Sequence, residues 1–225
     1  IHGGPAEKVG LLAGDRIISS NGVNLCKMQS NEVMKHLKGE KGSEARLEVI
    51  RRKDKEPLTF TVIRGDIPVE SVDASFLIDD EIGYVRIKNF GENTFPEMLT
   101  SLAHLHFNGM KSLIIDLRGN RGGYMHPSIQ MANEFLEKNQ LIVYTEGSKV
   151  KREDYRANGL GSFKHLPLVV LMDEMSASSS EIFAGAIQDN DRGTIIGRRS
   201  FGKGLVQQPM EFSDGSVVRL TIARY

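Results

Sequence analysis

The first part of the chain, residues 1–64, alternates short apolar patterns with turn residues. Apolar spacing predicts helices over Ala6–Leu12 and about Ser30–Lys38, and strands over Ala45–Arg51 and Leu58–Arg64. Asn21-Gly22 is a typical two-residue hairpin turn. Together these elements predict a small module of mixed α and β structure.

A connector is predicted over residues 67–80. After it, segments with the apolar periodicity of strands alternate with segments that have the periodicity of helices. Strands are predicted at 82–87, 112–117, 141–145 and 168–172, and helices from Thr94 and over Ser128–Lys138. The polar, glycine-containing segment 146–165 is long enough to form a flap over a site. A hairpin is expected over Glu211–Tyr225. The order of the elements predicts an α/β fold, mixed in its strand directions.

The stretch from Met175 to Gln207 carries the candidate chemistry. A serine cluster turns into a helix at about Ser178–Ser180, with Glu181 in the first turn. Backbone N–H groups at a helix N-terminus lack helical partners and can hold an anion, including the oxyanion of a tetrahedral intermediate. From composition alone, a plain serine-capped helix is the more common explanation.

A lysine follows this helix between two glycines. In an extended segment, Lys203, Leu205 and Gln207 project from one face. A desolvated lysine loses its charge more easily and can then deprotonate a serine, and a glutamine on the same face could hold its amine. The alternative is a surface lysine in a glycine-rich hairpin.

These residues closely resemble the active-site region of the carboxyl-terminal processing (tail-specific) proteases, which are serine peptidases with a Ser-Lys dyad. The matching runs are 176–182, SASSSEI, and 200–207, SFGKGLVQ. The resemblance implies Ser178 as the nucleophile, Lys203 as the general base and Gln207 as the residue that orients the lysine. Ser179 stands where the family usually has Ala, and Ser200 where it has Thr. The backbone N–H of Ser179 would serve the oxyanion hole with either side chain.

A predicted buried strand breaks into the run DLRGNRGG at residues 116–123. A glycine-rich phosphate loop is the rival interpretation, but Walker spacing is absent throughout the sequence. The run resembles a second motif of the same protease family, which implies a backbone N–H of Gly122 or Gly123 as the other oxyanion donor. Asp116 and Arg118 are expected to brace the loop.

The run from Gly3 to Leu25 resembles a PDZ domain, a module that binds extended peptide C-termini by strand addition. The family's PDZ domain begins earlier, with a strand and a carboxylate-binding loop, so we expect a truncated module here. Val33 and Leu37, on the helix after the hairpin, are the candidate groove residues. Packing of both in the core of the module is an equal alternative.

Composition narrows the function class. The chain has 29 Lys and Arg residues and 29 Asp and Glu residues, so no net positive charge favours the binding of nucleic acid. Neither a signal peptide nor an apolar run of membrane-spanning length is visible, and the single Cys26 excludes an internal disulfide. No metal motif or GxSxG elbow occurs, so no metal or cofactor is expected. Of the histidines, His126 is the best placed for a Ser-His-Asp triad.

The resemblance covers nearly the whole chain and implies its organisation: a truncated PDZ domain over 1–66, the connector 67–80, and a crotonase-like serine protease core over 81–225 that is itself cut at the C-terminus. It implies cleavage of proteins near exposed C-terminal tails, in the periplasm or cell envelope of a bacterium, with a membrane-associated adaptor as a further partner. Two other classes fit the sequence. One is an inactive PDZ-containing peptide-binding scaffold, and the other is a carrier of apolar ligands on the same fold.

Overall fold

The structure is a computed structural model that describes residues 3–54, 56–67 and 70–225. The chain divides into two compact units, residues 1–69 and residues 70–225. Each unit has its own hydrophobic core. The two units are described separately below.

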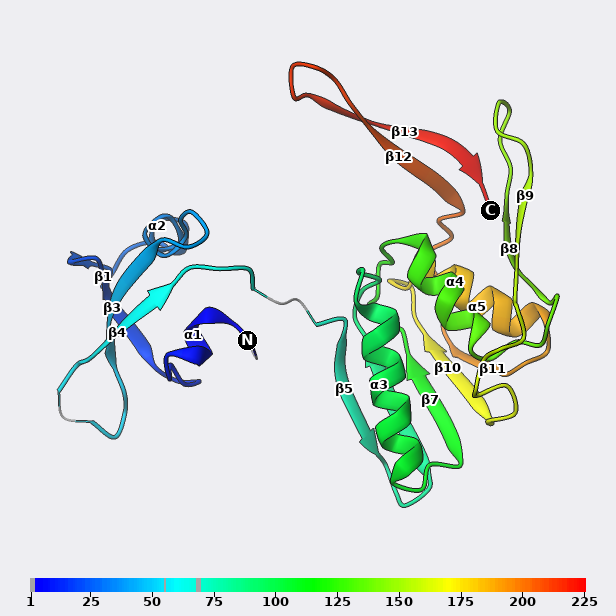
Figure 1. Cartoon of the computed structure of the whole chain (residues 1–225), viewed down its shortest axis with the longest axis horizontal. Coiled ribbons are helices and arrows are strands. Elements are labelled where there is room, and N and C mark those ends of the chain that lie inside the picture. Colours follow the sequence, from blue (N-terminus) through cyan, green and yellow to red (C-terminus); the bar gives the residue numbers. More distant parts are fainter. Residues whose placement is uncertain (1–2, 55, 68–69) are drawn as a thin grey trace. The chain divides into compact units, whose positions relative to one another are not determined.

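The first unit is an antiparallel sheet of four strands in the order β2-β1-β3-β4, with two helices (Figure 1). Buried and exposed residues alternate strictly along β3, and its inward side chains form the core with Val62. Helix α1 is shorter than the predicted Ala6–Leu12, because Gly10 adopts a positive φ of 87° that a helix cannot continue. The bounds are α1 Pro5–Lys8, β1 Arg16–Ser20, β2 Val23–Asn24, α2 Ser30–Leu37, β3 Glu44–Ile50 and β4 Leu58–Ile63.

The second unit is built on a five-stranded mixed sheet in the order β11-β10-β7-β6-β5. Strands β6, β7, β10 and β11 are parallel, and β5 runs antiparallel to β6 at one edge. The bounds are β5 Val72–Leu77, β6 Ile82–Ile87, β7 Ser112–Asp116, β10 Leu168–Met172 and β11 Thr194–Gly197. The carboxyl ends of β7 and β10, which are adjacent and parallel, therefore lie side by side.

The predicted connector over 67–80 is corrected by strand β5. Residues Val72–Leu77 pair with β6 and form the edge of the sheet, so most of this range belongs to the second unit. The apolar residues Phe76, Leu77 and Ile78 at the end of the strand gave only a weak local signal. Cross-strand pairing, which sequence periodicity does not report, decides the assignment. Pro68, which marked the connector in the sequence, lies outside the described residues.

The second unit has three helices: α3 Thr94–Phe107, α4 Met125–Asn133 and α5 Ser179–Asp189 (Figure 1). Helices α3 and α5 pack on strands of the sheet, and α4 packs against both of them. Helix α4 begins and ends earlier than the predicted Ser128–Lys138. Its apolar continuation, Phe135 and Leu136, is still fully buried, but it follows the helix in a turn. The core consists of the inward faces of β6, β7 and β10 and of residues from all three helices.

Two antiparallel hairpins extend from this core (Figure 1). One pairs β8 Leu141–Thr145 with β9 Glu153–Arg156, and the other pairs β12 Leu205–Glu211 with β13 Val217–Arg224. The second hairpin begins earlier than the predicted Glu211. Backbone hydrogen bonds between Glu146 and Arg224 join the base of the second hairpin to the loop that follows β8 in the first.

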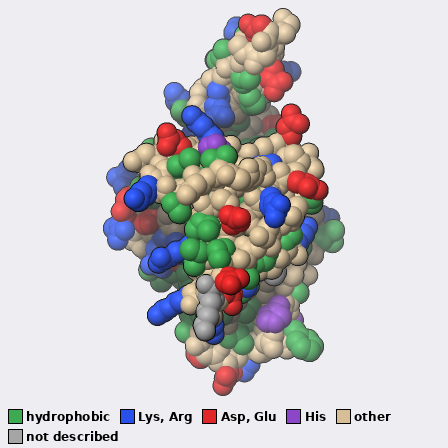
Figure 2. Space-filling model, turned by 90° about the vertical axis from the view of Figure 1, so that its left-hand side faces the viewer, with side chains coloured by type: hydrophobic (Ala, Val, Ile, Leu, Met, Phe, Trp, Pro, Cys, Tyr) green, Lys and Arg blue, Asp and Glu red, His purple; other side chains and the backbone are tan. Residues whose placement is uncertain are grey.

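The surface carries charges of both signs. Acidic and basic side chains are interspersed on the face that Figure 2 displays. Within the described residues, no helix is both long enough and apolar enough to cross a membrane.

Candidate active site

Ser178 lies at the sharp turn between β10 and α5, directly before the first helical residue. Its backbone has φ 58° and ψ −116°, a combination that non-glycine residues rarely adopt. Holding a residue there costs about 1–3 kcal/mol, and such strain clusters at functional sites. Ser178, at the N-terminus of the helix, is half-buried and lines a pocket. Ser179 and Ser180, which follow it, are buried.

Asn120 connects this turn with the glycine loop after β7. Its side chain is fully buried and donates a hydrogen bond to the Ile87 carbonyl at 2.9 Å. The backbone carbonyl of Asn120 accepts hydrogen bonds from the Ala177 N–H at 3.0 Å and from Ser180 Oγ at 2.9 Å. The backbone carbonyl of Asn120 therefore fixes the position of the serine cluster relative to the glycine loop, and its buried side chain holds that loop in place.

Only glycine fits at positions 122 and 123 of the loop after β7, because other backbone atoms lie very close to both. A Cβ on Gly122 would lie 2.7 Å from the Ala177 carbonyl oxygen and 2.8 Å from the Cβ of Ser178. A Cβ on Gly123 would lie 2.1 Å from the Phe90 carbonyl oxygen. The loop backbone is therefore pressed directly against the serine turn, as only glycine permits.

The backbone N–H groups of the two glycines differ. The N–H of Gly122 donates to Asn120 Oδ1 at 2.9 Å. The N–H groups of Gly123 and Ser179 have no hydrogen-bond partner in the described part of the chain. The hydroxyl of Ser179 donates to the carbonyls of Gly123 and Tyr124 at 3.1 and 3.0 Å, which ties α5 to the glycine loop.

Glu181, in the first turn of α5, joins the serine turn to the lysine loop. Its Oε2 accepts from the Ser178 N–H at 2.7 Å and the Lys203 N–H at 2.9 Å, and its Oε1 accepts from Ser200 Oγ and the Gly202 N–H, both at 2.7 Å. Burial would raise the pKa of Glu181, but these hydrogen bonds outweigh it and hold the pKa below its usual value. The carboxylate is therefore charged at neutral pH.

Lys203 is half-buried, and its backbone is held from two sides. Glu181 accepts from its N–H, and the hydroxyl of Tyr225 donates to its carbonyl. Burial raises the pKa of Tyr225, so this phenol stays a donor. In the described part of the chain, the Lys203 ammonium makes no hydrogen bond with Ser178 or Gln207.

The residues that the sequence singled out nevertheless surround one open pocket of about 570 Å³. Its lining residues from the candidate set are Ser178, Ser179, Gly122, Gly123, Lys203 and Gln207. His126 is exposed and does not line this pocket, although its neighbour Met125 does. The expected flap over 146–165 contributes no lining residue either, because part of it pairs with β8 as strand β9.

The candidate PDZ groove residues lie on α2. Both Val33 and Leu37 are half-buried. Leu37 packs against the core of the first unit, whereas Val33 is not among the residues that do so. Of the two, Val33 is the more available for a ligand.

Asn120, Glu181 and Tyr225 were not predicted as site residues. Asn120 and Glu181 stand inside the two motifs, so their position in the sequence was a usable signal. Tyr225 carried none, because its contact with Lys203 depends on the pairing of β12 with β13. Among the described residues, no group of three or more His, Cys, Asp or Glu side chains could hold a metal ion.

Comparison with known proteins identifies the family of the chain. Residues 81–225 match peptidase family S41, and residues 1–51 match a PDZ domain. Because the first match spans most of the chain, the protein belongs to peptidase family S41 and combines it with a PDZ domain.

Curated relatives and a solved structure share this organisation. The chain is 36% identical to the carboxyl-terminal-processing protease of Synechocystis sp. over 100% of this chain and 53% of that protein. It is 37% identical to the carboxy-terminal processing protease CtpA of Bacillus subtilis, over 100% of this chain and 48% of the relative. The photosystem II D1 C-terminal processing protease superposes with a TM-score of 0.62 at 31% identity, covering 98% of this chain and 60% of that one. The chain thus spans about half the length of these curated relatives.

Proposed function

We propose that this protein is a serine endopeptidase that cleaves protein substrates near their C-terminal tails through a Ser-Lys dyad. The observation that carries the proposal is the meeting of a strained Ser178, the half-buried Lys203 and two unpaired backbone N–H groups at one pocket. Membership of peptidase family S41 and the names of the relatives support the same activity.

In this mechanism Ser178 Oγ attacks the peptide carbonyl carbon, and Lys203, as a neutral amine, takes the hydroxyl proton. Gln207 orients the amine from the same pocket. The protonated lysine then gives its proton to the leaving amine, and water hydrolyses the acyl-enzyme. The missing Ser178–Lys203 hydrogen bond is consistent with this role, since such contacts often tighten only when substrate binds.

We assign the oxyanion hole to the N–H groups of Ser179 and Gly123. Neither donor has a hydrogen-bond partner among the described residues, and the hydroxyl of Ser179 links the segments that carry them. Gly122 is the weaker candidate because its N–H already donates to Asn120. Its role would be to let the loop approach Ser178.

The remaining assignments extend the same proposal. The module over 1–66 would bind exposed peptide C-termini, with Val33 in its groove, and deliver them to the core over 81–225. Action on protein tails in an extracytoplasmic compartment, with a membrane-associated adaptor, would follow the family resemblance.

The test is cleavage of a protein with an unstructured C-terminal tail by the wild type, Ser178→Ala and Lys203→Ala. Loss of cleavage in both variants, with unchanged circular dichroism, is expected. Cleavage that survives either change would move the chemistry to other residues. Tail binding without cleavage by the wild type would instead support the peptide-binding scaffold.

A further inference from the structure

The pocket beside Ser178 has both cationic and apolar lining residues. Arg121 and Arg219 both line it, and none of its lining residues is Asp or Glu. Its apolar wall includes Phe90, Met125 and Ile182. The lining therefore presents positive charge near the reacting serine. The charged carboxylate of Glu181 accepts from the Ser178 N–H but does not line the pocket.

The two arginines differ from four other arginines of the second unit. Arg118, Arg152, Arg156 and Arg198 each form an ion pair with a nearby carboxylate at 2.6–2.8 Å. In the described part of the chain, Arg121 and Arg219 form none. Their guanidinium groups are therefore available for a carboxylate that the protein itself does not supply.

Arg121 is held close to the serine by its neighbour in the chain. It directly precedes Gly122, whose backbone is pressed against Ala177 and Ser178. The loop in which Arg121 lies is fixed on its other side by the buried Asn120. Its side chain therefore extends from a rigid point at the edge of the pocket.

Arg219 reaches the pocket from the β12–β13 hairpin. It is the cross-strand partner of Pro209, and Thr221 is the partner of Gln207. Directly opposed residues share one face of a hairpin, and so do residues two apart on a strand, so Arg219 lies on the face of Gln207 and Pro209. All three of these residues line the pocket. The register of this hairpin thus brings a second guanidinium to the pocket that the glycine loop also lines.

We propose that Arg121 and Arg219 form a carboxylate subsite that selects peptides with a negative charge close to the scissile bond. This inference rests on the proposed protease function and adds a specificity to its site. Guanidinium groups bind carboxylates through paired, charge-assisted hydrogen bonds. The carboxylate is either an acidic side chain or the free C-terminus of the substrate, since the two present the same group.

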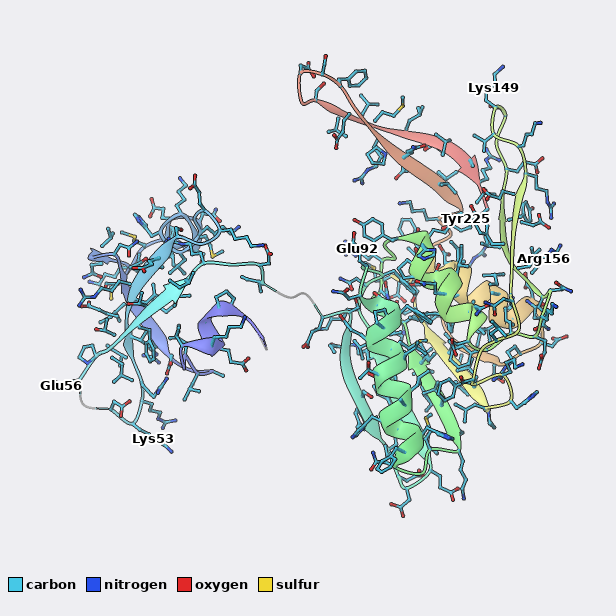
Figure 3. The ribbon with its side chains drawn as sticks, viewed as in Figure 1. Lys53, Glu56, Glu92, Lys149, Arg156 and Tyr225 are labelled. Atoms are coloured by element: carbon cyan, nitrogen blue, oxygen red, sulfur yellow. The ribbon has the colours of Figure 1, made fainter. Side chains whose placement is uncertain are left out.

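The experiment uses four peptides that combine Glu or Gln near the scissile bond with a free or amidated C-terminus. Cleavage is measured as kcat/KM for the wild type, Arg121→Gln, Arg219→Gln and Arg121→Lys. The control is Lys149→Gln, which removes a charge at the tip of the β8–β9 hairpin, away from the pocket (Figure 3). The same peptides are titrated onto Ser178→Ala with and without each arginine change, so that binding is measured apart from chemistry.

The four peptides form two kinds of charged and neutral pair: Glu with Gln, and free with amidated C-terminus. In one of these kinds, we expect the wild type to prefer the charged member by about five- to tenfold in kcat/KM, mainly through KM. Each Arg→Gln change should reduce this ratio, Arg121→Lys should keep part of it, and added salt should weaken it. A lost preference for Glu identifies the side chain as the carboxylate, and a lost preference for the free C-terminus identifies the α-carboxylate. Peptide preferences that the arginine variants leave unchanged would overturn the subsite.

Failure of the proposed function gives a different result. If no peptide is cleaved but the arginine variants still lower the binding preference, the subsite stands and the proteolytic assignment does not. If peptides are cleaved with no arginine-dependent preference in either assay, the protease stands and the subsite is refuted.

Discussion

One carboxylate oxygen, Oε2 of Glu181, accepts hydrogen bonds from the backbone N–H groups of both Ser178 and Lys203, at 2.7 and 2.9 Å. The nucleophile and the base of the proposed dyad are therefore positioned by the same atom. The pocket holds no direct Ser178–Lys203 hydrogen bond, so this shared acceptor links the two residues through a single atom. The site depends on it even though Glu181 would not itself touch the substrate.

We expect Glu181→Gln to lower kcat about ten- to a hundredfold while leaving KM within a few fold. A Gln side chain has the same shape, but its NH₂ group is itself a donor. It would face N–H and O–H groups whose hydrogen bonds the carboxylate now accepts. Steady-state kinetics on a tail peptide measure the effect. The control is Glu92→Gln, an exposed residue on the loop before α3 (Figure 3). A KM effect alone would contradict a positioning role.

The same carboxylate gives a pH dependence of stability. The pKa of Glu181 in the folded protein is below its ordinary value of 4.5. The contribution of the ionised carboxylate to the free energy of unfolding is therefore fully present above pH 4.5. It is lost as the pH falls through the lower, folded-state pKa. Urea unfolding from about pH 5 to about pH 3 should therefore show a shallower loss of free energy in Glu181→Gln than in the wild type. Equal slopes would show that the hydrogen bonds do not stabilise the charged form.

Ser179→Ala removes the hydroxyl that ties α5 to the carbonyls of Gly123 and Tyr124. Both carbonyls lose a donor, so we expect about 1 kcal/mol lower stability and a several-fold lower kcat, because the Gly123 N–H is held less firmly. Thermal unfolding and kinetics measure the two effects. Ser148→Ala, at an exposed position of the β8–β9 hairpin, should change neither. Full activity in Ser179→Ala would exclude a role for this tie in catalysis.

Two glycines of one loop form a matched pair. Gly119 and Gly122 both have positive φ, 76° and 93°, but a Cβ on Gly119 meets nothing within 4 Å. Gly119→Ala should therefore cost only about 1 kcal/mol of conformational strain. Gly122→Ala should abolish activity, because its Cβ overlaps Ala177 and Ser178. Similar stability and activity in the two variants would mean that the loop can move away from the serine turn.

The first unit offers a separate test. Leu37 packs against the core of its sheet, whereas Val33 does not. Leu37→Ala should lower the stability of this unit by about 1–2 kcal/mol, as expected for a half-buried leucine. Val33→Ala should weaken binding of a tail peptide with little change in stability. Binding titrations and thermal unfolding of both variants separate the two roles, and a reversed pattern would move the groove to Leu37.

Much of this protein was determined by local sequence. The sequence predicted a strand over Ala45–Arg51, and the structure has β3 at Glu44–Ile50. The serine cluster with Glu181 predicted the start of α5, and the helix begins at Ser179. The resemblance of the two motifs to a protease family also named six of the residues that line the pocket. These features depend on neighbours in the chain, whose preferences a sequence displays directly.

Other features were decided by tertiary structure alone. The pairing of β5 with β6 moved most of the predicted connector into the sheet, and the Asn120 side chain occupied the N–H of Gly122 and left that of Gly123 free. The register of β12 and β13 brought Arg219 to the same pocket as Arg121. Each outcome depends on contacts between segments far apart in the chain. Such contacts follow from packing and strand register, which leave no periodic signal in a single sequence.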